Sequence, residues 1–322
     1  IEDVKQMVPV YDLKEHWPVR RPEDPNFWDE SDKDLDGALF CPEGGYVNDP
    51  ELSAHYIMRA AETHGAVFMF NAEVVDIRSE AGRVTGITLK DGTRVDAPVV
   101  VNVGGPHSYK INAMAEGVLE GCNIKTKALR HEVMHCPSPG DYDYLNDGFH
   151  TSDGDVGCYY RPEVGNMFLI GSEDPDCDPQ EWVDPDDFYA GKGGPGRDNQ
   201  LSDAQWKAQC YRLAKRVPSL PIPHQPRGVV DLYDVSDDWI PIYDKSDLKG
   251  FYLAIGTSGN QYKNAPVGGA MMAELIDACE KGLDHDKAPF QFKMRYTGRV
   301  LDTGVFSRKR EINPDSSFSV NG

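Results

Sequence analysis

The chain has 322 residues, of which 39% are hydrophobic, and it carries a formal net charge of −20 at pH 7. This length suits one large domain or two medium ones. The acidic charge argues against a nucleic-acid partner, since phosphate contacts require clustered Lys and Arg, and no apolar run is long enough to span a bilayer. We therefore expect a cytoplasmic protein without a membrane segment, whose acidic residues lie mainly on the solvated surface.

The cysteines, seven in number, are scattered along the chain and never take the C-x-x-C spacing. An odd number of scattered cysteines favours free thiols in a reducing compartment over a disulfide framework.

The first hundred residues predict a helix followed by short strands. Residues 1–36 mix Pro, Asp and Trp without a clear period and predict an irregular acidic segment. Asp49 and Pro50 fit the N-cap and first turn of a helix that runs through His64. The strand-like runs that follow include a hairpin around an Asp-Gly turn and end in a continuous apolar run typical of a strand buried on both faces: 67–70, 74–77, 84–89, 94–97 and 99–103.

An acidic stretch near the N-terminus matches the spacing of an EF-hand calcium loop, with aspartates at 32, 34 and 36, Gly37 and Glu43. Such a loop binds calcium only when two helices present it. Prolines at 22, 25 and 42 interrupt the flanking segments, so we interpret the stretch as a solvated acidic turn.

The middle of the chain, from about Lys125 to Ile242, is dominated by alternating polar and apolar residues, which predicts a mostly antiparallel sheet. The strand candidates are 128–135, 157–160, 167–170 and 229–233, and one helix is expected over Ser202–Arg216.

A zinc-protease pattern, H-E-x-x-H, occurs from His131 to His135. It holds a metal only on a helix, where side chains four residues apart are neighbours. Here the residues alternate as on a strand and Pro137 follows, and on a strand the two imidazoles would be roughly 13 Å apart. We predict no metal site.

A Gly-x-Gly-x-x-Gly match runs from Gly191 to Gly196. A dinucleotide fingerprint follows an apolar strand and opens a helix. An acidic segment precedes this match and Pro195 lies within it, so it predicts a flexible surface loop.

The segment from Phe251 to Ile276 is the most informative in the chain. Phe251–Ile255 is a strand-like apolar run, Gly256 and Gly259 interrupt it, and Pro266 suits the first turn of the helix that follows. A strand that turns through glycines into a helix presents bare backbone N–H groups and a positive helix end to an anionic or electron-rich ligand. An ordinary strand–loop–helix connection is the alternative.

Together these segments resemble the amine and amino-acid oxidoreductase family that includes D-amino-acid oxidase, glycine oxidase and monomeric sarcosine oxidase. In that family a Gly-x-Ser-Gly-x-x-x-Lys stretch passes the flavin ring and leads into a final helix, and the matching residues here are Gly256, Ser258, Gly259 and Lys263. Further matches occur upstream in the same order, at 37–47, 99–108, 159–162 and 170–171. The similarity runs from about Ile1 to Ile276.

The resemblance implies FAD as cofactor. It places Val74 and Val75 beside the adenine and Gly104 and Gly105 along the dinucleotide. The residues implied at the flavin ring are Gly256, Ser258, Gly259, Asn260 and Gln261. A simple strand-to-helix turn is the alternative for the Gly104–Gly105 pair.

The implied substrate is a small amine or amino acid, oxidised at its C–N bond by hydride transfer to flavin. A substrate carboxylate needs a cation, and Lys263 matches the family lysine that contacts it. Arg161 is a second candidate, with Tyr159 and Tyr160 before it, of which strand alternation sends only one into the site. Either cation could instead be an ordinary surface charge, and a core tyrosine is the alternative for each ring.

Two departures from sarcosine oxidase bear on the activity. Its flavin-linking cysteine falls near Asp231, so a covalent flavin bond there is not expected, and the lysine credited with oxygen activation falls near Leu169. Dehydrogenase and oxidase activity therefore both stay open.

The resemblance implies a mixed α/β and α+β fold: the remainder of a Rossmann-like FAD-binding domain plus a mostly antiparallel β-sheet substrate domain. We expect residues 1–124 and 244–282 in the first, 125–243 in the second, and a C-terminal tail at 283–322.

The family opens with a Gly-rich strand–turn–helix that this sequence lacks. We therefore expect this segment either on a companion polypeptide or on a part of the protein outside these 322 residues. The alternative function is a non-catalytic remnant of the family that acts as a binding or scaffold subunit.

Overall fold

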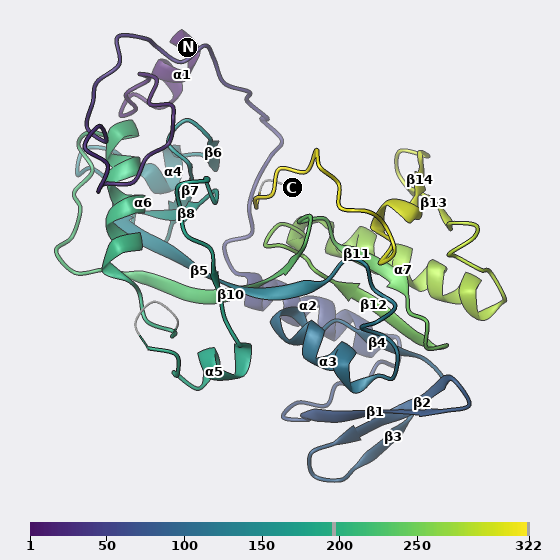
Figure 1. Ribbon diagram of the computed structural model, residues 1–322. Helices are drawn as coiled ribbons and strands as arrows, with labels where there is room; N and C mark the ends of the chain where they lie inside the picture. Colours follow the sequence, from purple (N-terminus) through teal and green to yellow (C-terminus); the bar gives the residue numbers. More distant parts are fainter. Residues whose placement is uncertain (195–197, 321–322) are drawn as a thin grey trace. The chain divides into compact units, whose positions relative to one another are not determined.

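The computed structural model describes residues 1–194 and 198–320, which fold into a mixture of helices and sheets (Figure 1). The chain divides into two compact units. Unit 1 contains residues 1–70, 132–179 and 194–231, and unit 2 contains residues 71–131, 180–193 and 232–322. The predicted fold class is confirmed, with antiparallel sheets beside a short parallel pair of strands.

Unit 1 is built on an antiparallel sheet. Its strand order is β10-β5-β8-β7-β6, from β10 (Gly228–Ser236), β5 (Thr126–Pro137), β8 (Met167–Ser172), β7 (Cys158–Glu163) and β6 (Thr151–Asp153). β5 and β10 are long enough to contribute residues to both units. All four predicted strands of this region are therefore present.

Helix α6 (Asp203–Arg216) covers this sheet (Figure 1). Its apolar stripe packs on the alternate residues that β5, β7 and β8 turn toward it, and the buried side chains include Trp206, Cys210, Leu213, Met134, Tyr160, Phe168 and Ile170. Ser202 caps the helix by accepting a hydrogen bond from the backbone N–H of Gln205. The helix begins and ends where its sequence predicts.

Two arginines of α6 are fully buried and paired. Arg212 makes a bidentate pair with Asp178, at 2.7 and 2.8 Å, and Arg216 reaches Asp153 and Asp155. Asp178, Asp153 and Asp155 therefore neutralise buried arginines.

The first 36 residues belong to unit 1, whereas the sequence places them with the FAD-binding half. Helix α1 (Glu2–Met7) leads into Val8, which is buried in the same core as α6. The backbone N–H of Asp12 donates to the carbonyl of Arg216. Other backbone N–H groups of the segment donate within local turns, as from Phe27 to Asp24, so it forms turns and one short helix without a strand.

Unit 2 is built on a sheet of three strands, in the order β11-β12-β4 (Figure 1). β12 (Phe251–Ile255) runs parallel to β4 (Val100–Asn102) and antiparallel to β11 (Ile242–Lys245). Helix α7 (Ala265–Glu280) packs on one face, and α3 (Ser108–Met114) contacts β4.

The apolar run of β12 is buried on both faces. Phe251, Leu253 and Ile255 lie in a core with Ile77 and Val84, whereas Tyr252 lies in the core that α7 covers. Successive residues of a strand point to opposite faces, so a strand with two covered faces is apolar throughout.

Unit 2 also contains an antiparallel meander of three strands, β1 (Val74–Glu80), β2 (Arg83–Leu89) and β3 (Arg94–Asp96). It contains the predicted hairpin. The remaining short elements are α4 (Tyr144–Asp147), β9 (Glu181–Trp182), α5 (Pro185–Tyr189), β13 (Gln291–Lys293) and β14 (Val300–Asp302).

The predicted helix after Asp49 forms as α2 (Pro50–Thr63), and the Asp49 side chain accepts from the backbone N–H of Leu52. It buries none of its residues. Residues 67–70, predicted as a strand, pair with no other strand in the described parts of the chain, and Val67 and Phe70 are 85% and 72% exposed. An apolar run becomes a strand only when a neighbouring strand accepts its backbone hydrogen bonds.

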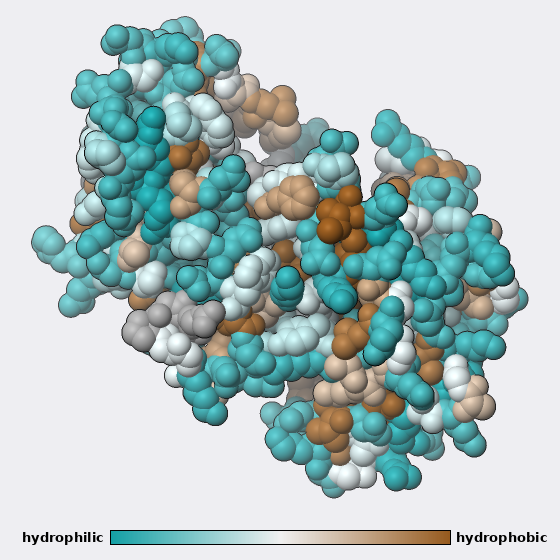
Figure 2. Space-filling view, viewed as in Figure 1, coloured by the Kyte–Doolittle hydropathy of each residue, from teal (hydrophilic) through white to brown (hydrophobic). Residues whose placement is uncertain are grey.

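The surface is mostly hydrophilic, with apolar residues exposed in patches (Figure 2). The most exposed apolar side chains include those of Leu39, Val67, Phe70, Val103 and Tyr296.

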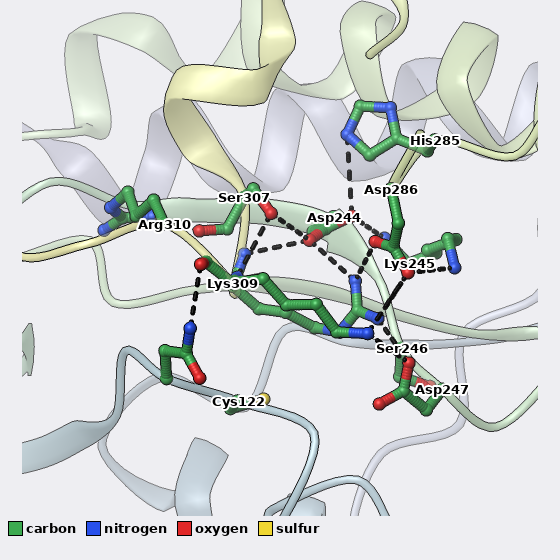
Figure 3. Close-up of polar contacts among 12 residues, drawn as sticks. Cys122, Asp244, Lys245, Ser246, Asp247, His285, Asp286, Ser307, Lys309 and Arg310 are labelled. Carbon is green, nitrogen blue, oxygen red and sulfur yellow. Dashed lines mark hydrogen bonds and ion pairs between the residues drawn. The ribbon is translucent and has the colours of Figure 1, made fainter. Parts of the chain in front are cut away.

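Residues 283–320 are folded into unit 2 instead of forming a free tail. Arg308 is fully buried, and its guanidinium reaches Asp244, Asp286 and Asp247 at 3.0, 2.9 and 2.6 Å. Figure 3 shows these three aspartates close to Lys309. Arg310 makes a bidentate pair with buried Asp238. The segment has a polar sequence because its charges are paired inside the unit.

Replacing Arg308 by Ala should strongly destabilise unit 2, because it leaves Asp244 buried and uncompensated. We expect a loss of about 3–5 kcal/mol in the free energy of unfolding, the usual cost of breaking a buried ion pair, measured by urea unfolding. The control is Arg299→Ala, at an exposed position of the same segment. Equal urea midpoints for the two variants would contradict this account.

Candidate functional site

The carboxyl ends of β4 and β12 lie next to each other, because the two strands are parallel neighbours. Each strand leads through a glycine turn into a helix. Val103–Gly105 leads into α3, and Gly256–Gly259 leads into α7. In open α/β sheets, ligands bind at this edge, where helix N-termini present unpaired backbone N–H groups.

A pocket of about 680 Å³ opens at this edge of unit 2. The turn after β12 contributes one side of it, with Thr257, Gly259, Gln261 and Tyr262. β4, β11, β12 and α7 supply a mainly apolar remainder: Val101, Val103, Tyr243, Ala254, Ala265, Gly268, Gly269, Met272, Ala273 and Ile276.

The turn after β12 has an unusual backbone. Gly256, Ser258 and Gly259 have φ values of 67°, 49° and 75°. Glycine adopts this left-handed region freely, whereas a serine there is strained. A Cβ on Gly259 would also lie only 2.7 Å from the ring of Tyr233. Both conformation and space therefore require glycine at position 259.

Ser258 is held in its strained conformation by three hydrogen bonds. Its backbone N–H donates to the carbonyl of Asp234 at 2.8 Å. Its hydroxyl donates to the carbonyl of Gly256 and accepts from the backbone N–H of Ser236. A strained residue persists only when its surroundings over-determine it.

The turn after β4 is fixed by Asn102. Its side-chain oxygen accepts from the backbone N–H of Gly104 at 2.9 Å, and its amide donates to the carbonyl of Ser108 and to Asn112. Gly105 has a φ of 54°, and no atom lies within 4 Å of the position its Cβ would take. Its backbone is therefore open to a ligand.

Asp234 connects the two turns. Its carboxylate accepts from the backbone N–H of Gly256 at 2.6 Å and from the hydroxyl of Ser108, the first residue of α3, at 2.8 Å. The Ser108 and Thr126 hydroxyls lie 2.8 Å apart. Burial raises the pKa of Asp234 to about 7. Sequence alone does not assign this residue to the site. A charged residue between Leu232 and Val235 on an apolar strand nevertheless indicates a buried polar role.

Asn260 adds a donor without a partner. The residue is 7% exposed, and its Nδ2 atom is buried with no hydrogen-bond partner in the described structure. Gln261 donates to the Asn260 side-chain oxygen, which orients the amide. A buried amide donor is rarely left unpaired, so this group suits a ligand acceptor such as a flavin carbonyl.

Lys263 is exposed and directly follows the pocket residues Gln261 and Tyr262. Neither an ion pair nor a hydrogen bond engages its side chain within the described residues. Its charge is available to a carboxylate. Val74 and Val75 open β1, with Val75 43% exposed, and their place beside an adenine stays a prediction.

Arg161, Tyr159 and Tyr160 belong to unit 1, on β7. The Arg161 guanidinium lies 3.0 Å from the carboxylate of Glu163 and 4.9 Å from the centre of the Tyr46 ring. Its charge is therefore already balanced. Its role as a substrate clamp stays a prediction.

Strand alternation separates the two tyrosines. Tyr160 is fully buried and its hydroxyl donates to Asp153, so it is a core residue. Tyr159 lies on the opposite face, as Arg161 does, with its ring stacked on His150. Of the two tyrosines, only Tyr160 is therefore assigned to the core.

The two metal patterns do not assemble ligand sets. His131 and His135 lie on strand β5, as their alternation predicts. Across residues 1–194 and 198–320, no group of three or more His, Cys, Asp or Glu side chains could hold a metal ion. The same residues include no helix long and apolar enough to cross a membrane. Gly191 follows α5, and Pro195 and Gly196 of the glycine-rich match lie outside the described residues.

The sequence profile of the FAD-dependent oxidoreductase family named DAO matches residues 5–275. The chain belongs to this family. The resemblance identified from the sequence is thereby confirmed, and FAD is the cofactor of the family.

Two curated relatives have similar sequences. Glycine oxidase of Geobacillus kaustophilus is 25% identical over 83% of this chain and 62% of its own length. Sarcosine oxidase subunit beta of Rhizobium meliloti is 24% identical over 75% of this chain and 51% of its own length. The chain therefore spans between about half and three fifths of the length of these relatives.

Among solved structures, L-proline dehydrogenase from P. horikoshii superimposes with a TM-score of 0.57. It is 17% identical, and the match covers 80% of this chain and 58% of that one. This likeness establishes the fold.

The residues at the edge of β4 and β12 fit a flavin. The Gly105 backbone is open, the turn at Gly256–Gly259 borders the pocket, and Asn260 offers an unpaired donor. When bound, FAD accepts the electrons removed from a substrate C–H bond.

Gly259→Ala should weaken FAD binding by about tenfold or more, since a positive φ and contact with Tyr233 would force the turn to move. The measurement is a titration of flavin fluorescence. The control is Gly140→Ala, where nothing lies within 4 Å of the new Cβ. An unchanged dissociation constant for Gly259→Ala would remove this turn from the cofactor site.

The raised pKa of Asp234 predicts a pH-dependent stability. Its pKa is 3.8 in the unfolded chain and about 7 when folded, so the protonated form is favoured by folding. The contribution of this carboxyl group to the free energy of unfolding is fully present below pH 3.8 and is lost as the pH rises through 7. The loss is a few kcal/mol, at about 1.4 kcal/mol per pKa unit.

Asp234→Asn should remove this dependence. Between pH 4 and pH 8, the free energy of unfolding in urea should therefore fall more for the wild type than for the variant. The groups that face the carboxylate are uncharged: Ser108, Thr126 and the backbone N–H of Gly256. A difference that is constant with pH would show that Asp234 is already ionised when the chain folds.

Proposed function

We propose that the protein is the greater part of an FAD-dependent oxidoreductase that oxidises the C–N bond of an amino acid or secondary amine. The observation that carries this proposal is the pair of glycine turns at the ends of β4 and β12, with the unpaired Asn260 donor in the second turn. Family membership supports it, and so do relatives named as glycine oxidase and sarcosine oxidase subunit beta.

Each residue of the turn has a task in this proposal. The backbone of Gly256–Gly259 lies close against the ring because glycine leaves room there. The Asn260 amide donates a hydrogen bond to the ring. Lys263 binds the carboxylate of the substrate and so orients its C–H bond, which proximity to the cofactor requires.

The rest of the FAD site is supplied by polypeptide outside these 322 residues. Support comes from the length comparison and from unit 2 itself, where β4 pairs only with β12 in the described part of the chain. Parallel strands are normally covered on both faces and flanked by neighbours. An apolar strand and a helix, carrying a Gly-rich turn, would pair with the open edge of β4 and cover Val101, Val103 and Met272.

Electrons leave to oxygen or to another acceptor. By the sequence resemblance, the lysine credited with oxygen activation in sarcosine oxidase falls near Leu169, which is part of β8 here and favours a dehydrogenase. Oxygen consumption compared with reduction of an artificial dye would distinguish the two.

The scaffold alternative is supported by Arg161, because Glu163 already balances its charge and leaves it less suited to bind a substrate carboxylate.

The protein purified with its companion polypeptide should show flavin absorbance and reduce that flavin when an amino acid or secondary amine is added. A colourless preparation that cannot be reconstituted with FAD would favour the scaffold.

Lys263→Ala should raise KM for a carboxylate substrate by about ten- to a hundredfold, the effect of losing one charge-assisted hydrogen bond. Flavin absorbance should not change. The control is Lys281→Ala, an exposed lysine just beyond the far end of α7. Unchanged kinetics would place Lys263 outside the substrate site.

A further inference from the structure

We infer that Asp234 is a positioning residue that holds both glycine turns of the candidate site in their ligand-binding geometry. It does not itself touch the ligand in this inference. The consequence for flavin affinity rests on the proposed function, whereas the link between the turns does not.

The first argument is that one carboxylate serves two turns. One oxygen accepts from the backbone N–H of Gly256, at the start of the turn after β12. The other accepts from Ser108, three residues beyond Gly105 in the turn after β4. The Asp234 carbonyl also accepts from the backbone N–H of Ser258.

The second argument is that the turn after β12 needs an external constraint. It contains three positive φ values, one of them at the buried Ser258, which costs about 1–3 kcal/mol of strain. The bonds to Asp234 lie at Gly256, where the turn begins, and at Ser258, the strained residue itself. Asn260, the unpaired donor, follows two residues later, so its position depends on the same constraint.

The third argument is the contrast with other buried aspartates. Asp178, Asp238 and Asp244 are each paired with a buried or nearly buried arginine: Arg212, Arg310 and Arg308. Asp234 instead receives hydrogen bonds from a backbone N–H and hydroxyl groups. The bond from the Gly256 N–H fixes the position of the backbone at the start of the turn. Its raised pKa is typical of residues at functional sites.

Hydrogen exchange in the full chain without added FAD tests the link directly. Asp234→Ala should raise amide exchange about tenfold or more in residues 104–109 and 256–262 together, because both turns lose their shared acceptor. Asp234→Asn should have a smaller effect at Gly256, since its amide oxygen still accepts the N–H. Ser108→Ala should affect residues 104–109 more than 256–262.

The matched control is Asp244→Asn, another fully buried aspartate of unit 2. It should raise exchange near Arg308 and leave both turns unchanged. Exchange that rises uniformly across unit 2 in Asp234→Ala and Asp234→Asn, or that rises in one turn only, would overturn the inference.

Flavin titration provides the second readout. With the companion polypeptide present, Asp234→Ala should weaken FAD binding by about tenfold, and Asp244→Asn should not at matched fractions of folded protein. If exchange rises in both turns of Asp234→Ala but the wild type does not bind FAD, the proposed function is overturned and the role of Asp234 in holding both turns is supported. If the wild type binds FAD and Asp234→Ala binds it equally well, the positioning role of Asp234 is overturned.

Discussion

The parallel pairing of β4 with β12 is the constraint on which the rest of the candidate site depends. Phe251 pairs with Val100 and Leu253 with Asn102, so the two strands end at the same edge. Each then needs a turn whose backbone is not extended, and glycine supplies it at Gly105 and Gly256. The glycine turns that lead into α3 and α7 are thereby brought to the same edge of the sheet.

Charge pairing has a larger part in this protein than its acidic composition suggests. Fully buried arginines at 212, 216 and 308 are each matched by aspartates, and Arg310 by Asp238. A buried guanidinium is tolerated only when carboxylates satisfy it. These pairs attach α6 to its sheet and the C-terminal segment to unit 2. Asp234 differs from them, since its donors are neutral and belong to the site.

The exposed apolar surfaces have a common physical explanation. α2 buries none of its residues, residues 67–70 remain unpaired, and Val103 is 69% exposed at the end of β4. Apolar strands and helices are stable when covered. The curated relatives are longer than this chain, and additional polypeptide is the occupant we propose for the open edge of β4.

Local pattern was sufficient for the elements that repeat a simple period. β12 matches its predicted range of Phe251–Ile255, and α6 begins after its Ser202 cap, because apolar spacing and caps act within a few residues. β11, α3, β13 and β14 are not apparent from the sequence. They are short, and β11, for example, is joined through its own Asp244 to Arg308, which is distant along the chain.

By itself, the sequence determined the family, the fold class and the glycine turn at Gly256–Gly259, since these are properties of residue order and local conformation. Only the tertiary structure decided that Tyr160 belongs to the core, that Glu163 balances Arg161, and that Asp234 binds both turns. Those outcomes depend on which strands become neighbours and which side chains share a buried space. No short stretch of sequence contains that information.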